Sequence, residues 1–327
     1  MNDQPEVLTV GRVGVDLYPQ QSGVPLAEVA SFAKSLGGTA TNVAVAAARL
    51  GRRSAVLTKV GPDGFGDYVR TALETFGVAA RYVGTAPNLL TPVVFCELTP
   101  PTDPPLLFYR APIAPDLTLT AADVPWDVVD SVPLLWVTGT GVSVEPARET
   151  QRAILRRRGR RDHTVLDLDY RPMFWSAEST ARARIAELIE WVSVVVGNRE
   201  EMRVVVGTAD PEAAADRLLA AGVRLAVVKC GADGVLIATA EERCTVPAHP
   251  VEVVCGLGAG DGFGGALVHG LLAGWPPRRL AAYANAAGAL VAGRLACADA
   301  MPTREQIERL LAVDPATMRP EIRERAR

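Results

Sequence analysis

The sequence predicts an α/β fold, with a doubly wound, mostly parallel central sheet flanked by helices and a small β lid. Strand-like and helix-like segments alternate along the chain, which is the pattern of a parallel sheet with crossover helices. Several strand-like runs, such as VSVVVGN at 192–198, are continuously apolar, as strands buried on both faces are. Two long, proline-containing segments, at about 18–36 and 88–112, break the alternation with period-two patches and predict the lid.

The first half of the expected core contains three strands and three helices. VLTVGRVGVDL predicts a strand over 8–17 with a break at Gly11-Arg12, and NVAVAAARLG predicts a small-residue helix over 42–51 that Gly51 ends. SAVLTKVG at 54–61 and LLWVTG at 134–139 are typical of buried strands. Helical periodicity predicts helices near 64–76 and 145–158.

The second half continues the same alternation. TVLDLD at 164–169, the apolar run at 192–198 and LAVVKCG at 225–231 predict strands. One helix is expected between the strand at 164–169 and about residue 191, and two more are expected near 198–205 and 211–221. We therefore expect one domain over 1–313, followed by a charged, poorly packed tail at 314–327.

The composition is that of a globular protein and excludes several classes of partner. The 327 residues are about half apolar and carry a net charge of −3, so a nucleic-acid partner is not indicated. The one basic run, at 156–161, follows a helical pattern that it could cap or solvate. Five widely spaced cysteines without a CxxC pair favour a reduced, cytoplasmic location, and no apolar segment is long enough to predict a membrane span.

The stretch CGLGAGDGFGGAL at 255–267 is the strongest candidate for a site. Its glycines precede a helical pattern, so unpaired backbone amides at a helix N-terminus could bind an oxyanion or a phosphate. Taken alone, Asp261 could be a helix cap. It could also be the base that accepts a hydroxyl proton during phosphoryl transfer to an alcohol. The chain has no GxxxxGKS/T motif, which excludes a P-loop.

Two motifs resemble the signatures of the ribokinase-like, or PfkB-type, carbohydrate kinases. They are GGTATNVAVAAARLG…KVG at 37–61 and GAGDGFGGAL at 258–267, and the resemblance extends over nearly the whole chain. Within that family, LDYRPMFW (168–175), FYR (108–110) and DAMPTREQIERLL (299–311) resemble the 5-dehydro-2-deoxygluconate kinases of myo-inositol catabolism. The related 2-keto-3-deoxygluconate kinases have similar Tyr-Arg and Arg-containing loops.

The resemblance implies roles for residues around the sugar. Asp261 would be the general base, and Gly258, Ala259 and Gly260 would form the anion hole. The residues implied in sugar binding are Asp16, Gly38, Asn42, Tyr109, Arg110 and Arg171. Of these, the two arginines suit the carboxylate of an acid sugar, because a guanidinium can bind a carboxylate through two hydrogen bonds. Arg171 could instead face the ATP phosphates, and Asn42 could simply cap a helix.

The resemblance also implies ATP and Mg²⁺ as cofactors. The residues implied on the nucleotide side are Asn198, Lys229, Gly231, Gly234 and Asn285, with Glu201 reaching Mg²⁺ through water. Cys255, Gly256 and Leu257 replace the Asp-Thr-Thr type of lead that is frequent in the family, so a K⁺ requirement is doubtful.

The activity implied is ATP-dependent phosphorylation of the terminal hydroxyl of a sugar acid, 5-dehydro-2-deoxy-D-gluconate being the first candidate. The alternatives are a 2-keto-3-deoxygluconate kinase, a fructokinase, or a sugar-binding regulator without turnover. Because β lids have edges that pair readily, a homodimer through the lid is expected.

Overall fold

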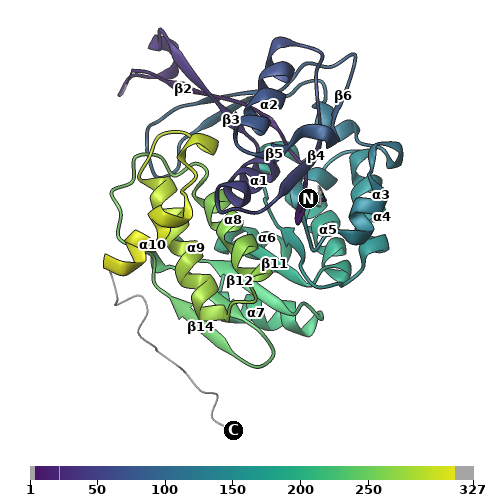
Figure 1. Cartoon of the computed structure of the whole chain (residues 1–327), viewed down its shortest axis with the longest axis vertical. Coiled ribbons are helices and arrows are strands. Elements are labelled where there is room, and N and C mark those ends of the chain that lie inside the picture. The colour runs from purple at the N-terminus through teal and green to yellow at the C-terminus, as the bar shows by residue number, and fades with distance from the viewer. Residues whose placement is uncertain (1–3, 22, 314–327) are drawn as a thin grey trace.

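The computed structural model describes residues 4–21 and 23–313 and contains two sheets (Figure 1). The tail expected at 314–327 lies outside the described residues. The larger sheet has the strand order β14-β13-β12-β11-β10-β9-β1-β4-β5, with β6 also paired to β4. It is parallel except at the β13 and β14 edge. Its strands are β1 (Val7–Val10), β4 (Ser54–Val60), β5 (Val78–Ala79), β6 (Val83–Thr85), β9 (Leu134–Thr138), β10 (Thr164–Asp167), β11 (Val194–Asn198), β12 (Leu225–Lys229), β13 (Val235–Ala238) and β14 (Arg243–Val246).

Helices cover both faces of this sheet, as the continuous apolar strands predict. In β9, Leu134 and Trp136 pack toward one face, while Leu135 and Val137 pack toward the other. The first face carries α1 (Thr39–Arg49), α2 (Gly64–Thr75), α8 (Ala259–Leu272), α9 (Pro277–Ala292) and α10 (Arg304–Val313). The second face carries α3 (Trp126–Ser131), α4 (Ala147–Arg158), α5 (Glu178–Leu188), α6 (Arg199–Val205) and α7 (Pro211–Ala220).

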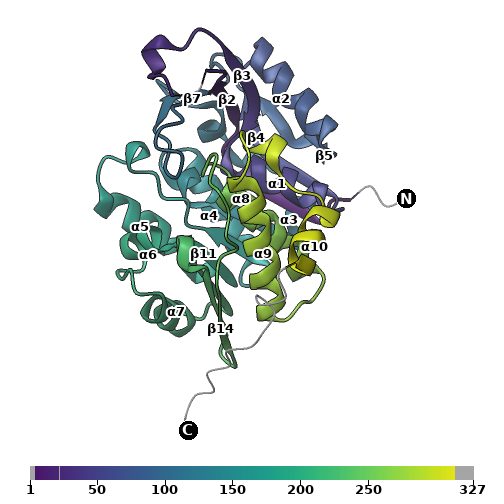
Figure 2. The same ribbon diagram turned by 90° about the vertical axis from the view of Figure 1, so that its left-hand side faces the viewer.

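The smaller sheet projects from one end of the core, as Figures 1 and 2 both show. Its order is β3-β2-β7-β8, and only the β2-β7 pair is parallel. Its strands are β2 (Gly14–Pro19), β3 (Phe32–Gly37), β7 (Val93–Cys96) and β8 (Leu106–Tyr109). Three of its strands, β3, β7 and β8, come from the two segments that break the alternation, whereas most of β2 precedes the first of them. The expected homodimer through this second sheet stays a prediction.

The prediction of one strand over 8–17 is wrong, because the chain divides it between the two sheets. β1 ends at Val10 in the core, and β2 begins at Gly14 in the second sheet. Gly11 has φ 152°, and a Cβ there would lie 2.6 Å from Thr138 Oγ1, so the backbone passes close to β9 at the turn. The break leaves Arg12 between the sheets, next to the carboxyl ends of the parallel strands, where such sheets bind ligands.

Within residues 4–21 and 23–313, the structure contains no helix with the length and apolar character that crossing a membrane requires.

Candidate active site

The N-terminus of α8 lies between two cavities, one on each side of its first turn. Gly258 and Asp261 line a small cavity of about 60 Å³, whereas Ala259 and Gly260 line a larger one of about 700 Å³. The first amides of a helix have no partner within it, and the helix dipole makes this end positive. Gly258 is left-handed at φ 79°, and a Cβ on it would lie 3.0 Å from Cys297 Sγ. Glycine therefore suits this turn because it adopts the left-handed conformation readily and because a side chain here would crowd Cys297.

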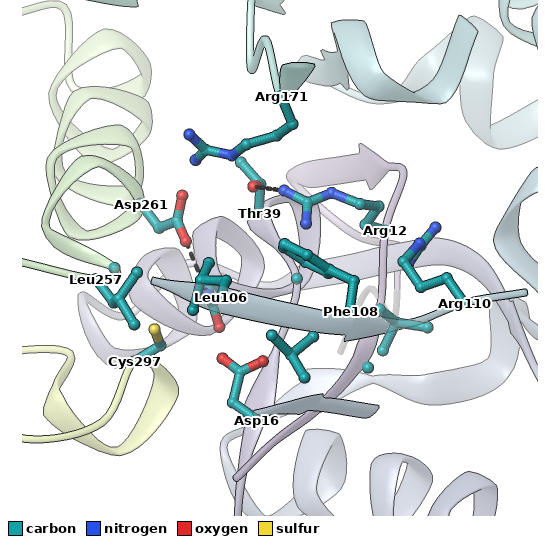
Figure 3. Close-up of a pocket in the computed structure, with 16 residues that line it drawn as sticks. Arg12, Asp16, Thr39, Leu106, Phe108, Arg110, Arg171, Leu257, Asp261 and Cys297 are labelled. Atoms are coloured by element: carbon teal, nitrogen blue, oxygen red, sulfur yellow. Dashed lines mark hydrogen bonds between the residues drawn. The ribbon is translucent and has the colours of Figure 1, made fainter. Parts of the chain in front are cut away.

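Asp261 is held in place by a side chain of α1. Asn42 Nδ2 donates a hydrogen bond to Asp261 Oδ2 at 2.8 Å, the contact drawn in Figure 3. Burial raises the pKa of Asp261 to about 6, although the hydrogen bond from Asn42 opposes the shift. A carboxylate with this pKa is ionised at neutral pH and is still a better proton acceptor than an ordinary aspartate.

The other predicted sugar-side residues gather around the same small cavity. Asp16, from β2, and Gly38, which caps α1, both line it. A Cβ on Gly37 would lie 2.1 Å from Asp16 Oδ1, and one on Gly38 would lie 2.4 Å from the Arg12 carbonyl oxygen. Burial raises the pKa of Asp16 to about 7, although the positive charge of Arg12 opposes the shift. Asn42 Oδ1 is buried and has no hydrogen-bond partner in the described part of the chain, which leaves an acceptor free for a ligand.

Arg12 also lines the small cavity, although no motif in the sequence predicted a role for it. Its Nη2 donates to Thr39 Oγ1 at 2.5 Å and to the Asp169 carboxylate at 3.1 and 3.2 Å. Asp169 also accepts from Thr140 at 2.7 Å and pairs with Arg171 at 3.4 Å. Burial acts to raise the pKa of Asp169, but the charges of Arg12 and Arg171 outweigh it and hold the pKa below its usual value. The available signal for Arg12 was a lone arginine at the break between two apolar strand segments.

The two predicted carboxylate-binding arginines are already paired with aspartates. Arg110 lines the small cavity, but its Nη2 donates to both carboxylate oxygens of Asp116, at 2.8 and 3.0 Å. The Arg171 guanidinium extends toward Asp261 in Figure 3. Tyr109 does not reach this cavity: its side chain is 61% exposed and packs against Phe95, because it lies on the other face of β8 from Phe108.

Four of the predicted nucleotide-side residues line the larger cavity: Lys229, Gly231, Gly234 and Asn285. Asn285 Nδ2 donates to the carbonyl oxygens of Val246 and Pro247, both at 3.0 Å, so it also fixes the segment after β14. A Cβ on Gly260 would lie 3.3 Å from Lys229 Nζ, which puts this ammonium group beside the first turn of α8. The amides and the ammonium group together form a positive surface suited to phosphate.

Asn198 and Glu201 form a reciprocal cap at the start of α6. Asn198 Oδ1 accepts from the Glu201 amide at 2.9 Å, and Glu201 Oε2 accepts from the Asn198 amide at 2.7 Å. Burial disfavours the charged form of Lys229, but the nearby carboxylates of Asp167 and Glu201 outweigh this and raise its pKa. No group of three or more His, Cys, Asp or Glu residues among those described could hold a metal ion.

The family model for the pfkB family carbohydrate kinases matches residues 4–304 of this chain. A 5-dehydro-2-deoxygluconokinase of Photobacterium profundum is 34% identical over 313 residues, covering 93% of this chain and 94% of the relative. One of Geobacillus thermodenitrificans is 31% identical, covering 94% and 93%.

Solved structures agree with this assignment. A PfkB protein from Polaromonas sp. JS666 has a TM-score of 0.79 and 27% identity, covering 90% of this chain and 98% of its own. A fructokinase from Vibrio cholerae O395, solved with fructose, ADP and a calcium ion, has a TM-score of 0.82 and 25% identity over 95% of this chain and all of its own. Together with a glycine-rich helix N-terminus between two cavities, these matches show that the chain belongs to the pfkB family of carbohydrate kinases.

Proposed function

We propose that this kinase transfers the γ-phosphate of ATP to the terminal hydroxyl of a sugar acid, 5-dehydro-2-deoxy-D-gluconate. One observation carries the proposal: the half-buried carboxylate of Asp261 lies at a helix N-terminus between a small cavity and a larger one. The names of the relatives at 31% and 34% identity support the substrate.

In the proposed reaction, Asp261 is the general base. The substrate hydroxyl lies against Asp261, which Asn42 orients, and loses its proton to the carboxylate as the oxygen attacks the γ-phosphorus. The new O–P bond forms while the bond from the γ-phosphorus to the β,γ-bridging oxygen breaks, and ADP leaves. The amides of Gly258, Ala259 and Gly260 stabilise the negative charge on the transferred group. The second sheet closes over the sugar and excludes water.

On the nucleotide side, Lys229, Gly231, Gly234 and Asn285 hold ATP, and Asn198 fixes the adjoining start of α6. Mg²⁺ supplies charge neutralisation on the phosphates when it is bound. An oxygen donor nearby suits this ion: Glu201 provides a carboxylate near Lys229 and would act through water. A single carboxylate fits a metal that is held mainly by phosphate oxygens and water.

A fructokinase activity is the second candidate, because the Vibrio cholerae neighbour was solved with fructose. The purified chain should be assayed with ATP and Mg²⁺ against 5-dehydro-2-deoxygluconate, 2-keto-3-deoxygluconate and fructose, with ADP release as the readout. The proposal expects the first to have the highest kcat/KM. A higher kcat/KM for fructose would replace the substrate assignment. Sugar binding without ADP release would indicate a regulator instead of a kinase.

A further inference from the structure

We propose that Arg12 binds the carboxylate of the sugar acid, at the end of the small cavity remote from Asp261. The inference rests on the proposed function and assigns to Arg12 the contact that the sequence indicated for Arg110 and Arg171.

Arg12 is a buried guanidinium with an unused donor. The residue is 6% exposed, and its bonds from Nη2 to Thr39 and Asp169 fix it at the wall of the cavity. Among the residues that the structure describes, its Nε has no hydrogen-bond partner. A buried donor without a partner is costly, and the cost is removed when a ligand accepts the bond. An anion is the acceptor that a guanidinium binds best.

The two other arginines of the cavity are less suited to this role. Both carboxylate oxygens of Asp116 accept from Arg110, and the Asp116 side chain is only 1% exposed, so this charge is already paired inside the protein. Arg171 pairs with Asp169, and its guanidinium points toward Asp261 (Figure 3). That direction leads to the end where phosphate is transferred.

The place of Arg12 fits the length of the substrate. In Figure 3 Asp261 lies on one side of the cavity, with Leu257, and Arg12 lies on the other, with Phe108 and Arg110. A sugar acid that directs its terminal hydroxyl to Asp261 directs its carboxylate to the opposite end. Arg12 also lines an adjoining cavity of about 460 Å³, which gives that end room.

Aromatic side chains shield this end from water. The Arg12 guanidinium lies 5.5 Å from the centre of the Phe174 ring, and Phe108 packs edge-on against the same ring at 4.9 Å. An ion pair formed beside apolar rings is screened less than one in water, so the carboxylate gains more from Arg12 here than it would at an exposed arginine.

The test compares 5-dehydro-2-deoxygluconate with its methyl ester, which has the same carbon chain without the charge. For the wild-type chain we expect kcat/KM to favour the acid by about 100-fold, the effect of a buried charged hydrogen bond. Arg12→Gln should reduce this preference to within about 3-fold, and Arg12→Lys, which keeps the charge without the planar fork, should give an intermediate value. Arg110→Gln is the matched control and should change both substrates alike.

The inference is overturned if Arg12→Gln keeps the preference for the acid, or if Arg110→Gln removes it. Because the bond to Asp169 could make Arg12→Gln unstable, ATP affinity and thermal unfolding are measured for every variant. If Arg12→Gln does not fold, Arg12→Lys decides, and an unchanged preference in that variant overturns the inference. Failure of the proposed function is distinguishable, because the wild-type chain would then phosphorylate fructose but no sugar acid.

Discussion

The two cavities that meet at α8 recognise their ligands by different means. Three arginines and two aspartates line the small cavity. In the large cavity, the charged or titratable side chains of the lining are those of Lys229 and His249. Glycine, alanine and valine form much of the remaining wall of the large cavity. If the sugar binds in the small cavity and ATP in the large one, as proposed, the sugar is selected by charge and the nucleotide by shape and backbone contacts. Selection by charge should be more sensitive to single substitutions and to pH.

The largest effect is expected where the cavities meet. Asp261→Asn removes the base while keeping the size and the contact to Asn42, so kcat should fall by about 10²- to 10⁴-fold. ATP affinity should change little, because Asp261 lines the small cavity and not the large one, where we propose that ATP binds. Steady-state kinetics and ATP titration of the variant measure both quantities. A variant with near wild-type turnover would contradict the assignment of the base.

The pH dependence of kcat/KM should follow the protonation of Asp261 in the small cavity. With a pKa of about 6, Asp261 is protonated as the pH falls through 6 and can no longer accept the hydroxyl proton. We therefore expect kcat/KM for the sugar to fall about fivefold between pH 6 and pH 5. ATP affinity, measured over the same range, is the internal control. A sugar kcat/KM that is constant from pH 5 to pH 8 would argue against a carboxylate base.

A pair of glycine substitutions tests whether the two cavities are independent. A Cβ on Gly37 would strike Asp16 at 2.1 Å, so Gly37→Ala should raise the sugar KM by about tenfold and leave the ATP KM unchanged. A Cβ on Gly234 would lie 2.0 Å from the Val246 carbonyl oxygen, so Gly234→Ala should raise the ATP KM instead. If either variant changed the sugar KM and the ATP KM to a similar extent, the two cavities would not be independent.

The smallest effect concerns stability. Burial raises the pKa of Asp16 to about 7, so between its usual 3.8 and 7 the folded protein holds a proton that the unfolded chain releases. The free energy of unfolding therefore decreases as the pH rises through this window. Asp16→Asn, which has no charge to bury, should unfold about 2 to 4 °C higher than the wild type at pH 8.

The difference in Tm should disappear toward pH 4, where Asp16 is protonated in the folded state. Asp103→Asn, at an exposed position, is the control and should give no pH-dependent difference in thermal unfolding. A higher Tm for Asp16→Asn that is equal at pH 4 and pH 8 would point to packing as its cause.

Much of the fold could be predicted from the sequence, because strands buried on both faces and glycine-rich turns have strong local patterns. The grouping of Asp16, Asn42 and Asp261 could also be predicted, since it depends on motifs at helix starts and strand ends. The ion-pair partners of Arg12 and Arg110 could not be predicted from the sequence. Arg110 pairs with Asp116 because of the path the chain takes after β8, and Arg12 is buried because a strand divides between two sheets. Both depend on contacts between segments far apart in the sequence or on irregular backbone.

The small cavity has one wall in the second sheet and another in helices of the core. Asp16, Val94 and Phe108 come from the second sheet, whereas Asn42 and Asp261 come from helices of the core. A bound sugar would therefore add contacts between two parts of the molecule that already share a hydrophobic cluster, to which Val15 and Leu36 contribute from the second sheet and Val45 from α1. Phosphorylated product could depart only after those added contacts are broken.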